Sequence, residues 1–211
     1  MVRFITFEGG DGSGKTTQIN ALESYLRDCG REYISTREPG GTSLGKMLRQ
    51  VLLQVGEQEI APSAELFLYL ADRAQHVSEV IAPAIAVGKI VLCDRFTDST
   101  LAYQGYGRGI DLNLLKRFND VADQGVRPDI TFLLDCPVAQ GLARTAHRPV
   151  TTGQPREDRF EREEMEFHEK VRRGFIEMAR QEPERFRVVD ASRSEQEVTA
   201  EVRRIIDREL D

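Results

Sequence analysis

Residues 9–16 form a pattern that can bind a chain of phosphates. They read Gly-Gly-Asp-Gly-Ser-Gly-Lys-Thr, which matches G-x-x-x-x-G-K-[ST], between an apolar run and a helical pattern. Glycines let backbone N–H groups turn around an anion, the lysine reaches the β- and γ-phosphates, and the threonine hydroxyl ligates Mg²⁺. The pattern predicts a site for a nucleoside triphosphate. Its predicted contacts are Gly10, Asp11, Gly12, Ser13, Gly14, Lys15, Thr16 and Thr17.

Asp94 is the second candidate for this chemistry. It follows Ile-Val-Leu-Cys, and an acidic residue at the end of an apolar strand holds Mg²⁺ in phosphate-loop enzymes, directly or through water. Thr16 and Asp94 are therefore the predicted metal residues. Arg95, the next residue, could meet a second phosphate or form a surface ion pair.

Two further segments could hold a heterocycle and a sugar. Ser99, Thr100, Tyr103 and Gln104 recur at near-helical spacing and could hydrogen-bond a base edge, or face solvent on a capped helix. Tyr69 and Arg73 are four residues apart on a predicted helix, so an aromatic ring and a guanidinium share one face, or Tyr69 packs in the core.

The elements that must position these groups alternate between strand and helix. Strands are predicted at Phe4–Phe7, Glu32–Thr36, Lys89–Cys93, Asp129–Leu134 and Phe186–Val189. Helices are predicted at about 14–28, 43–54, 63–87, 111–123, 137–146, 159–181 and 194–210, with Pro83 kinking or ending the third near Ala82. This order predicts an α/β fold with a mainly parallel sheet and helices on both faces. Ligands of such sheets lie beyond the carboxyl ends of the strands, where Glu8, Arg37, Asp94, Asp135 and Asp190 gather.

Residues 147–158 interrupt the alternation with two prolines, a glycine and several polar residues. The segment could be a plain connection. Because arginines lie in or beside it, we expect a single domain, 1–211, with a mobile lid at about 144–159. The candidate lid arginines are Arg144, Arg148 and Arg156.

Composition limits the class of protein. A net charge of −6 disfavours a nucleic-acid polymer as partner. No apolar stretch approaches the roughly 20 residues that span a membrane. Three widely spaced cysteines favour reduced thiols and a cytoplasmic location. The histidines show no metal-ligand spacing and are expected at the surface or as caps: His76, His147 and His168.

Four motifs in this order resemble bacterial thymidylate kinases over essentially the whole chain. They are Phe-Glu-Gly-Gly-Asp-Gly-Ser-Gly-Lys-Thr-Thr, Thr-Arg-Glu-Pro-Gly-Gly-Thr, Ala-Asp-Arg, and Asp-Arg-Phe-x-Asp-Ser-Thr-x-Ala-Tyr-Gln-Gly. The resemblance implies a three-layer α/β/α fold of the P-loop NTPase type with a five-stranded parallel sheet. It further implies a homodimer that transfers the γ-phosphoryl group of ATP to dTMP with Mg²⁺, giving dTDP and ADP.

The resemblance also implies roles for individual residues. Catalytic roles fall to Lys15, Asp11, Arg95 and one of the three lid arginines, since Gly12 rather than an arginine follows Asp11. Asp11 meets the sugar 3′-hydroxyl, and three arginines surround the dTMP phosphate. Tyr69 stacks on thymine, Arg73 donates to a thymine carbonyl, and Tyr103 crowds the 2′ position. The full set for dTMP is Asp11, Arg37, Glu38, Pro39, Arg49, Tyr69, Arg73, Arg95, Ser99, Thr100, Tyr103 and Gln104.

Elementary chemistry favours a phosphorylated acceptor over a hydroxyl acceptor. A monophosphate is already an anionic nucleophile, so no general base is required. The alternative, a deoxynucleoside kinase or another nucleoside-monophosphate kinase, stays open; the former needs a carboxylate base, such as Glu38 or Asp94. The chain lacks the Asn-Lys-x-Asp of GTP-binding switches and the Leu-Ser-Gly-Gly-Gln of transport ATPases.

Overall fold

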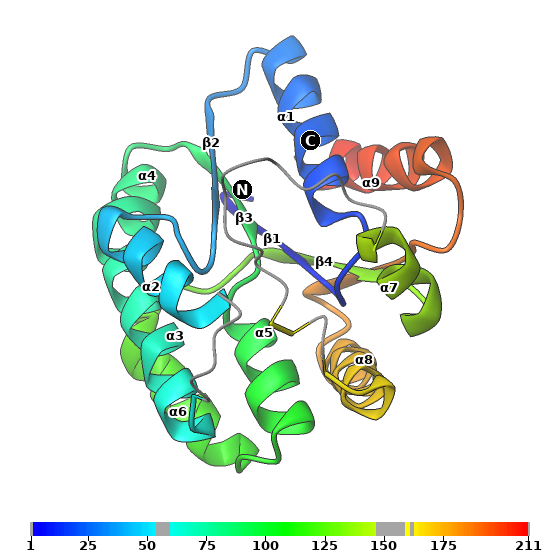
Figure 1. The fold of residues 1–211 in the computed structure, drawn as a ribbon. Helices are drawn as coiled ribbons and strands as arrows, with labels where there is room; N and C mark the ends of the chain where they lie inside the picture. The colour runs from blue at the N-terminus through cyan, green and yellow to red at the C-terminus, as the bar shows by residue number, and fades with distance from the viewer. Residues whose placement is uncertain (1, 54–59, 147–158, 161–162, 211) are drawn as a thin grey trace.

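The fold is built on a five-stranded parallel sheet (Figure 1). The structure, a computed structural model, describes residues 2–53, 60–146, 159–160 and 163–210. The sheet has the order β2-β3-β1-β4-β5, and each neighbouring pair is parallel. The strands are β1 (Phe4–Glu8), β2 (Tyr33–Arg37), β3 (Ile90–Asp94), β4 (Ile130–Asp135) and β5 (Phe186–Asp190).

Helices connect the strands and cover both faces of the sheet. They are α1 (Lys15–Asp28), α2 (Ser43–Leu53), α3 (Pro62–His76), η1 (Val77–Ile81), α4 (Ala82–Ala86), α5 (Thr97–Thr100), η2 (Leu101–Gly107), α6 (Leu112–Ala122), α7 (Val138–Ala146), α8 (Met165–Gln181) and α9 (Glu195–Leu210). Here η denotes a π-helical segment. The predicted three-layer α/β/α architecture is confirmed.

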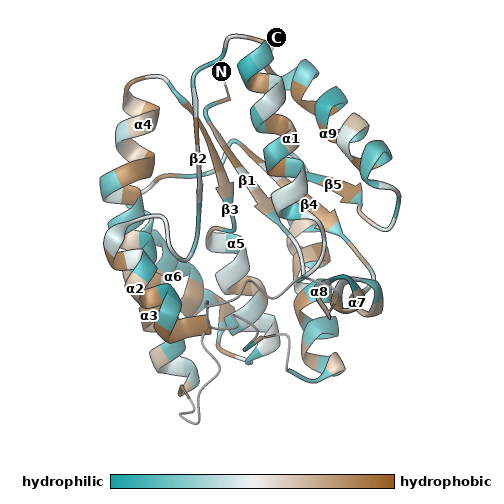
Figure 2. Ribbon diagram, turned by 45° about the horizontal axis from the view of Figure 1, so that its top comes forward, coloured by the Kyte–Doolittle hydropathy of each residue, from teal (hydrophilic) through white to brown (hydrophobic). Residues whose placement is uncertain are grey.

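The hydrophobic core lies on both sides of the sheet. Buried side chains of α1 and α9, such as Leu22 and Val202, pack against one face of the strands. The other face packs against η1 and α4 around Val77 and Ile81, and a third cluster joins η2 to α8 through Tyr103 and Phe175. Figure 2 shows the strands as largely hydrophobic, while the surrounding helices alternate hydrophobic and hydrophilic residues. The outer helices are thus held by one apolar side each.

Two of the predicted helices differ most from those observed. Pro83 does not end the helix near Ala82, because a π-helical turn precedes it and the Ala82 N–H donates to the Val77 carbonyl five residues back. A widened turn of this kind accommodates a proline, so the helix continues through α4 instead of ending. The helix predicted from residue 159 begins only at Met165, since the polar run before it does not continue the apolar periodicity of α8.

Each strand extends one residue beyond its predicted end, and that residue is charged in every case. Arg37 is in register with Asp94, and Asp135 with Asp190, while Glu8 closes β1. All five charges therefore lie along one edge of the sheet, as the sequence predicts for a ligand site.

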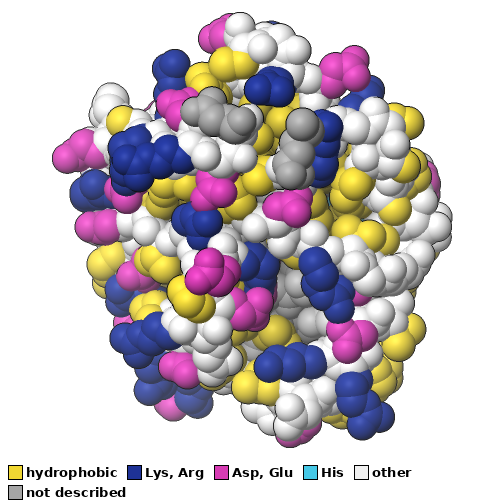
Figure 3. Space-filling view, turned by 180° about the vertical axis from the view of Figure 1, so that it is seen from behind, with side chains coloured by type: hydrophobic (Ala, Val, Ile, Leu, Met, Phe, Trp, Pro, Cys, Tyr) yellow, Lys and Arg dark blue, Asp and Glu magenta, His cyan; other side chains and the backbone are white. Residues whose placement is uncertain are grey.

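In the described part of the chain, no helix is long and apolar enough to cross a membrane. On the face shown in Figure 3, basic and acidic side chains are interspersed.

Candidate active site

The phosphate loop joins β1 to α1 and depends on glycine at its tightest points. Gly9, Gly12 and Gly14 have φ angles of +135°, +71° and +93°, which disfavour side chains. A Cβ atom on Gly12 would also lie 2.0 Å from the carbonyl oxygen of Gly141 on α7. The loop therefore packs directly on α7, and an arginine after Asp11 would not fit here.

Lys15 lies on the rim of this loop at the start of α1. Its ammonium group donates to the carbonyl oxygens of Gly9 and Gly10 at 3.0 Å and to the Ser13 hydroxyl at 3.4 Å. Burial and the neighbouring Arg95 lower the pKa of Lys15 to about 8. A phosphate in the loop would restore full protonation, because an adjacent anion favours the charged form.

Arg95 links the phosphate loop to the segment that follows β3. Its guanidinium donates to the Asp11 carboxylate at 2.7 Å, to the Gly9 carbonyl at 3.1 Å and to the Ser99 hydroxyl at 3.2 Å. Its backbone has a φ of +70°, a conformation that non-glycine residues rarely adopt and that is enriched at functional sites.

Asp11 also accepts a hydrogen bond from the Tyr103 hydroxyl at 3.3 Å. Burial opposes ionisation of this carboxyl, but Arg95 and Lys15 outweigh burial and lower its pKa. Asp11 of the phosphate loop thus meets Arg95 and Tyr103, both from the motif after β3, in one cluster.

Asp94 and Thr16 fit the requirements of a Mg²⁺ site. Asp94 ends β3 beside β1, and its Oδ1 atom is buried without a hydrogen-bond partner among the described residues. Thr16 lies in the first turn of α1 and is exposed. A carboxylate oxygen left without a donor and a threonine hydroxyl are ligands suited to a hard divalent cation.

Glu8, which the sequence places at the ligand edge of the sheet without a role, supports the site from below. Its buried carboxylate accepts from the backbone N–H of Phe96 at 2.7 Å and from the Ser99 hydroxyl at 2.6 Å. Burial and the charge of Asp98 raise the pKa of Glu8 to about 7. Glu8 therefore fixes the backbone turn that carries Arg95.

Glu8→Gln should stabilise the protein increasingly as the pH rises. The pKa of Glu8 is higher folded than unfolded, so the folded state holds the extra proton, and wild-type stability falls as the pH rises from about 4.5 to about 7. Relative to wild type, the free energy of unfolding of the variant should be almost unchanged at pH 4.5 and higher by on the order of 3 kcal/mol at pH 8. Thermal unfolding across this range measures the gain, with Glu184→Gln, which makes the same exchange at an exposed position, as the control. A gain that does not depend on pH would contradict this assignment.

Arg73 is the centre of a buried polar network under the predicted acceptor pocket. Its side chain donates to Glu38 at 2.8 Å, to Thr100 at 2.9 Å and to Asn119 at 2.6 Å, and the residue is 1% exposed. Asn119, from α6, was not predicted as a site residue. Arg73, Glu38 and Thr100 therefore come together as the motifs suggest.

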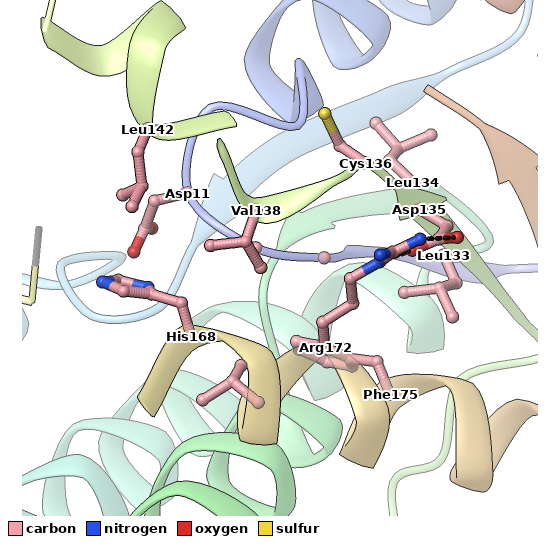
Figure 4. Close-up of a pocket in the computed structure, with 13 residues that line it drawn as sticks. Asp11, Leu133, Leu134, Asp135, Cys136, Val138, Leu142, His168, Arg172 and Phe175 are labelled. Atoms are coloured by element: carbon pink, nitrogen blue, oxygen red, sulfur yellow. Dashed lines mark hydrogen bonds and ion pairs between the residues drawn. The ribbon is translucent and has the colours of Figure 1, made fainter. Parts of the chain in front are cut away.

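The expectation of surface histidines is wrong for two of the three. His76 is fully buried, and its Nδ1 and Nε2 atoms lie 3.0 Å from Glu38 and 2.6 Å from the Thr36 hydroxyl. His168 on α8 is 6% exposed and faces Asp11 across a pocket between the phosphate loop and the end of β4 (Figure 4). Both are buried by elements distant in sequence, which spacing cannot reveal. His147 lies outside the described residues.

The remaining predicted acceptor residues lie on β2, on α2, on α3 and in the loop after β2. Arg49 on α2 donates to the Pro39 carbonyl at 2.9 Å, and the Asp72 carboxylate accepts from the Gly40 N–H at 3.1 Å. Arg37 is exposed at the end of β2. Tyr69 is half-buried, one helical turn before Arg73 on α3.

Of the candidate lid arginines, Arg144 lies in the described part of the chain, whereas Arg148 and Arg156 lie outside it. The guanidinium of Arg144 lies near the phosphate loop, where it donates to the carbonyls of Ala191 at 2.9 Å and of Gly12 at 3.5 Å. The lid predicted at 144–159 falls largely outside the described residues.

Comparison with known proteins agrees with this geometry. The family model described as "Thymidylate kinase" matches residues 7–202. The chain belongs to the thymidylate kinase family. A thymidylate kinase from Desulfovibrio desulfuricans is 52% identical over 208 residues, covering 98% of this chain and 96% of the relative. One from Geobacter sulfurreducens is 55% identical over 192 residues, with coverages of 91% and 90%.

A solved structure shows the same fold. The crystal structure of thymidylate kinase from Ehrlichia chaffeensis superposes with a TM-score of 0.76 at 38% identity, covering 97% of this chain and 98% of that one. The thymidylate kinase fold and activity predicted from the motifs are thereby confirmed. The enzyme phosphorylates dTMP to dTDP at the expense of ATP.

Proposed function

We propose that phosphoryl transfer takes place between the phosphate loop and Arg95. The observation that carries this proposal is the guanidinium of Arg95, which bonds both the Gly9 carbonyl of the loop and the Asp11 carboxylate. A cation in that position lies where a triphosphate in the loop would meet an acceptor phosphate. We assign the triphosphate to ATP and the acceptor to dTMP.

Charge neutralisation is the main task of this site. Two unit charges 4 Å apart repel by roughly 1 kcal/mol in water and by about 4 kcal/mol at an effective dielectric constant of 20. Both nucleotides carry several charges, so desolvating them together requires cations between them. Lys15 and Arg95 supply these cations and stabilise the equatorial oxygens of the transferring group.

The dTMP pocket is formed by the network around Arg73 and by the π-helical segment η2. Tyr69 and Arg73 share one face of α3, so the ring of Tyr69 stacks on the base while Arg73 donates to a base carbonyl. Thr100 and Gln104 meet the base edge, and Tyr103, held against Asp11, crowds the 2′ position and favours a deoxy sugar. Arg37, at the end of β2, and Arg49, on α2, approach the acceptor phosphate.

Thr16 and Asp94 would hold Mg²⁺ in this account. When bound, the ion neutralises charge on the β- and γ-phosphates. The unpartnered buried oxygen of Asp94 supports this assignment. Glu8 and Ser99 keep the adjoining backbone in place.

We also propose that residues 144–159 act as a lid that brings an arginine to the phosphates. Arg144 supports this proposal, since its guanidinium contacts the carbonyl of Gly12 in the phosphate loop. Closure over the nucleotides would exclude water and limit hydrolysis of ATP. Arg148 and Arg156 remain predicted alternatives for the arginine of the lid. A cytoplasmic location also remains a prediction.

A homodimer is the proposed assembly. Large apolar side chains are exposed on three adjacent helices, α2, α3 and α6: Met47 and Val51 are 59% and 55% exposed, Phe67 is 57% exposed and Val121 is 77% exposed. These helices lie side by side in Figures 1 and 2. A second copy of the chain covering this face would remove the apolar surface from water.

The expected dimer can be checked by sedimentation velocity. The wild-type chain should sediment as a dimer, and Phe67→Glu should shift it to a monomer because a buried unpaired charge is costly. Val188→Glu, at a similarly exposed position (52%) on the edge strand β5, should remain dimeric. A monomeric wild type, or equal effects of both variants, would contradict the assignment of this face.

The proposed function is tested by ADP release with ATP and a panel of acceptors. dTMP should be the best substrate, other nucleoside monophosphates should be weaker, and thymidine should be inert because it lacks the phosphate that the arginines bind. Turnover of thymidine at a rate comparable to that of dTMP would show that the acceptor is a hydroxyl group.

A further inference from the structure

Glu65 is a buried carboxylate at the edge of the predicted base pocket. It lies in the first turn of α3 and is fully buried. Its Oε1 atom accepts a hydrogen bond from the Nε2 group of Gln104 at 2.8 Å. Its Oε2 atom accepts one from Arg159 at 2.6 Å, and Arg108 forms a longer ion pair with it at 3.4 Å.

These contacts determine how the amide of Gln104 is oriented. Both oxygens of the Glu65 carboxylate face donor groups, one from Gln104 and the others from Arg159 and Arg108, and so act as acceptors. The amide end that meets Glu65 must therefore be the NH₂ group, and the carbonyl oxygen Oε1 is the end left for a ligand. Gln104 is 2% exposed, so packing also restrains its side chain.

Glu65 is also aligned with the residues proposed to recognise the base. Glu65, Tyr69 and Arg73 follow one another at four-residue spacing on α3 and so share one face of the helix. That face carries a ring for stacking, a guanidinium for a base carbonyl, and a carboxylate that contacts Gln104.

We propose that Glu65 is a positioning residue that makes the acceptor site select bases with a hydrogen on N3. Held by Glu65, Gln104 presents an acceptor to the base edge. Thymine and uracil carry N3–H, a donor, whereas N3 of cytosine is an acceptor and would face the amide oxygen without a hydrogen. This inference rests on the proposed function, in which Gln104 meets the base.

Glu65→Gln separates this role from a structural one. An amide at position 65 can donate as well as accept, so the amide of Gln104 is free to turn and offer its NH₂ group to cytosine. The ratio of kcat/KM for dTMP over dCMP should fall by about tenfold or more. The ratio for dTMP over dUMP should change less than twofold, because these bases differ at C5 and not at N3.

Arg108→Gln is the matched control. It removes one ion pair from Glu65 without touching Gln104, and the neighbouring Arg159 keeps the carboxylate paired. The dTMP over dCMP ratio should stay within twofold of wild type. An equal fall in this variant would overturn the proposal, since general loosening of the pocket would then explain both results.

The double variant Glu65→Gln/Gln104→Glu keeps the test decisive if the single variant folds poorly. It exchanges the two groups, so the amide at position 65 donates to the carboxylate at position 104, whose second oxygen again faces the base as an acceptor. Selection against dCMP should return to within about threefold of wild type. A double variant that discriminates no better than Glu65→Gln would overturn the proposal, as would a well-folded Glu65→Gln with an unchanged ratio. An unchanged KM for dTMP in Gln104→Ala would instead refute the proposed function, in which Gln104 meets the base.

Discussion

Replacing Lys15 with alanine should lower kcat by about 10²- to 10³-fold or more, the effect of removing one preorganised group that stabilises charge in the transition state. The fold should survive, because the Lys15 ammonium contacts two backbone carbonyls and one hydroxyl rather than a buried carboxylate. The carbonyls of Gly9 and Gly10 can bond water instead. The midpoint temperature of thermal unfolding of the variant should therefore lie within a few degrees of that of wild type, although turnover is lost.

The measurement is steady-state ADP release at saturating ATP and dTMP, with thermal unfolding in parallel. Lys170→Ala, which removes a lysine paired with Glu166 on the surface of α8, is the control and should retain wild-type turnover. Near-normal turnover of Lys15→Ala would remove the phosphate loop from the mechanism.

Arg73→Ala should have two effects of different origin. It removes the proposed donor to the base carbonyl, so the KM for dTMP should rise much more than the KM for ATP. It also leaves the buried Glu38 carboxylate without its guanidinium partner, which should destabilise the fold by about 3–5 kcal/mol. The sequence alone predicts only the first effect, because the burial of Arg73 cannot be read from its spacing.

Substrate kinetics and denaturant unfolding separate the two effects. The double variant Arg73→Ala/Glu38→Gln also removes the Glu38 carboxylate that Arg73→Ala leaves unpaired in the core. Much of the stability should therefore return, while the KM for dTMP stays high. Equal rises in the two KM values in both variants would place Arg73 outside the dTMP pocket.

The sheet, its order of elements and the phosphate loop could be predicted because each has a local sequence signal. Strands such as β3 are short apolar runs, and the octet at 9–16 matches one pattern. Asp11, Arg95 and Tyr103 could be named from their motifs, although their contacts with one another depend on the parallel pairing of β1 and β3.

The contacts that the sequence did not reveal are those of buried polar groups paired between distant segments. Glu8 holds the turn after β3, His76 holds Glu38, and Glu65 holds Gln104. Nothing in their immediate neighbours distinguishes them from solvent-facing residues, since the partner that offsets the cost of burial lies 30 or more residues away. The π-helical turn before Pro83 was missed for a similar reason, because the path of that helix is fixed by packing of Val77 and Ile81 on the sheet.

The central claim, that the two nucleotides meet end to end beside Arg95, is tested most directly by a crystal structure with dTMP and a non-hydrolysable ATP analogue. We predict that the γ-phosphate lies in the loop at 9–16 and that the dTMP phosphate lies against Arg95, in line with it. A structure in which dTMP binds away from Arg95, or in which the two phosphate groups lie too far apart for direct transfer, would contradict the account.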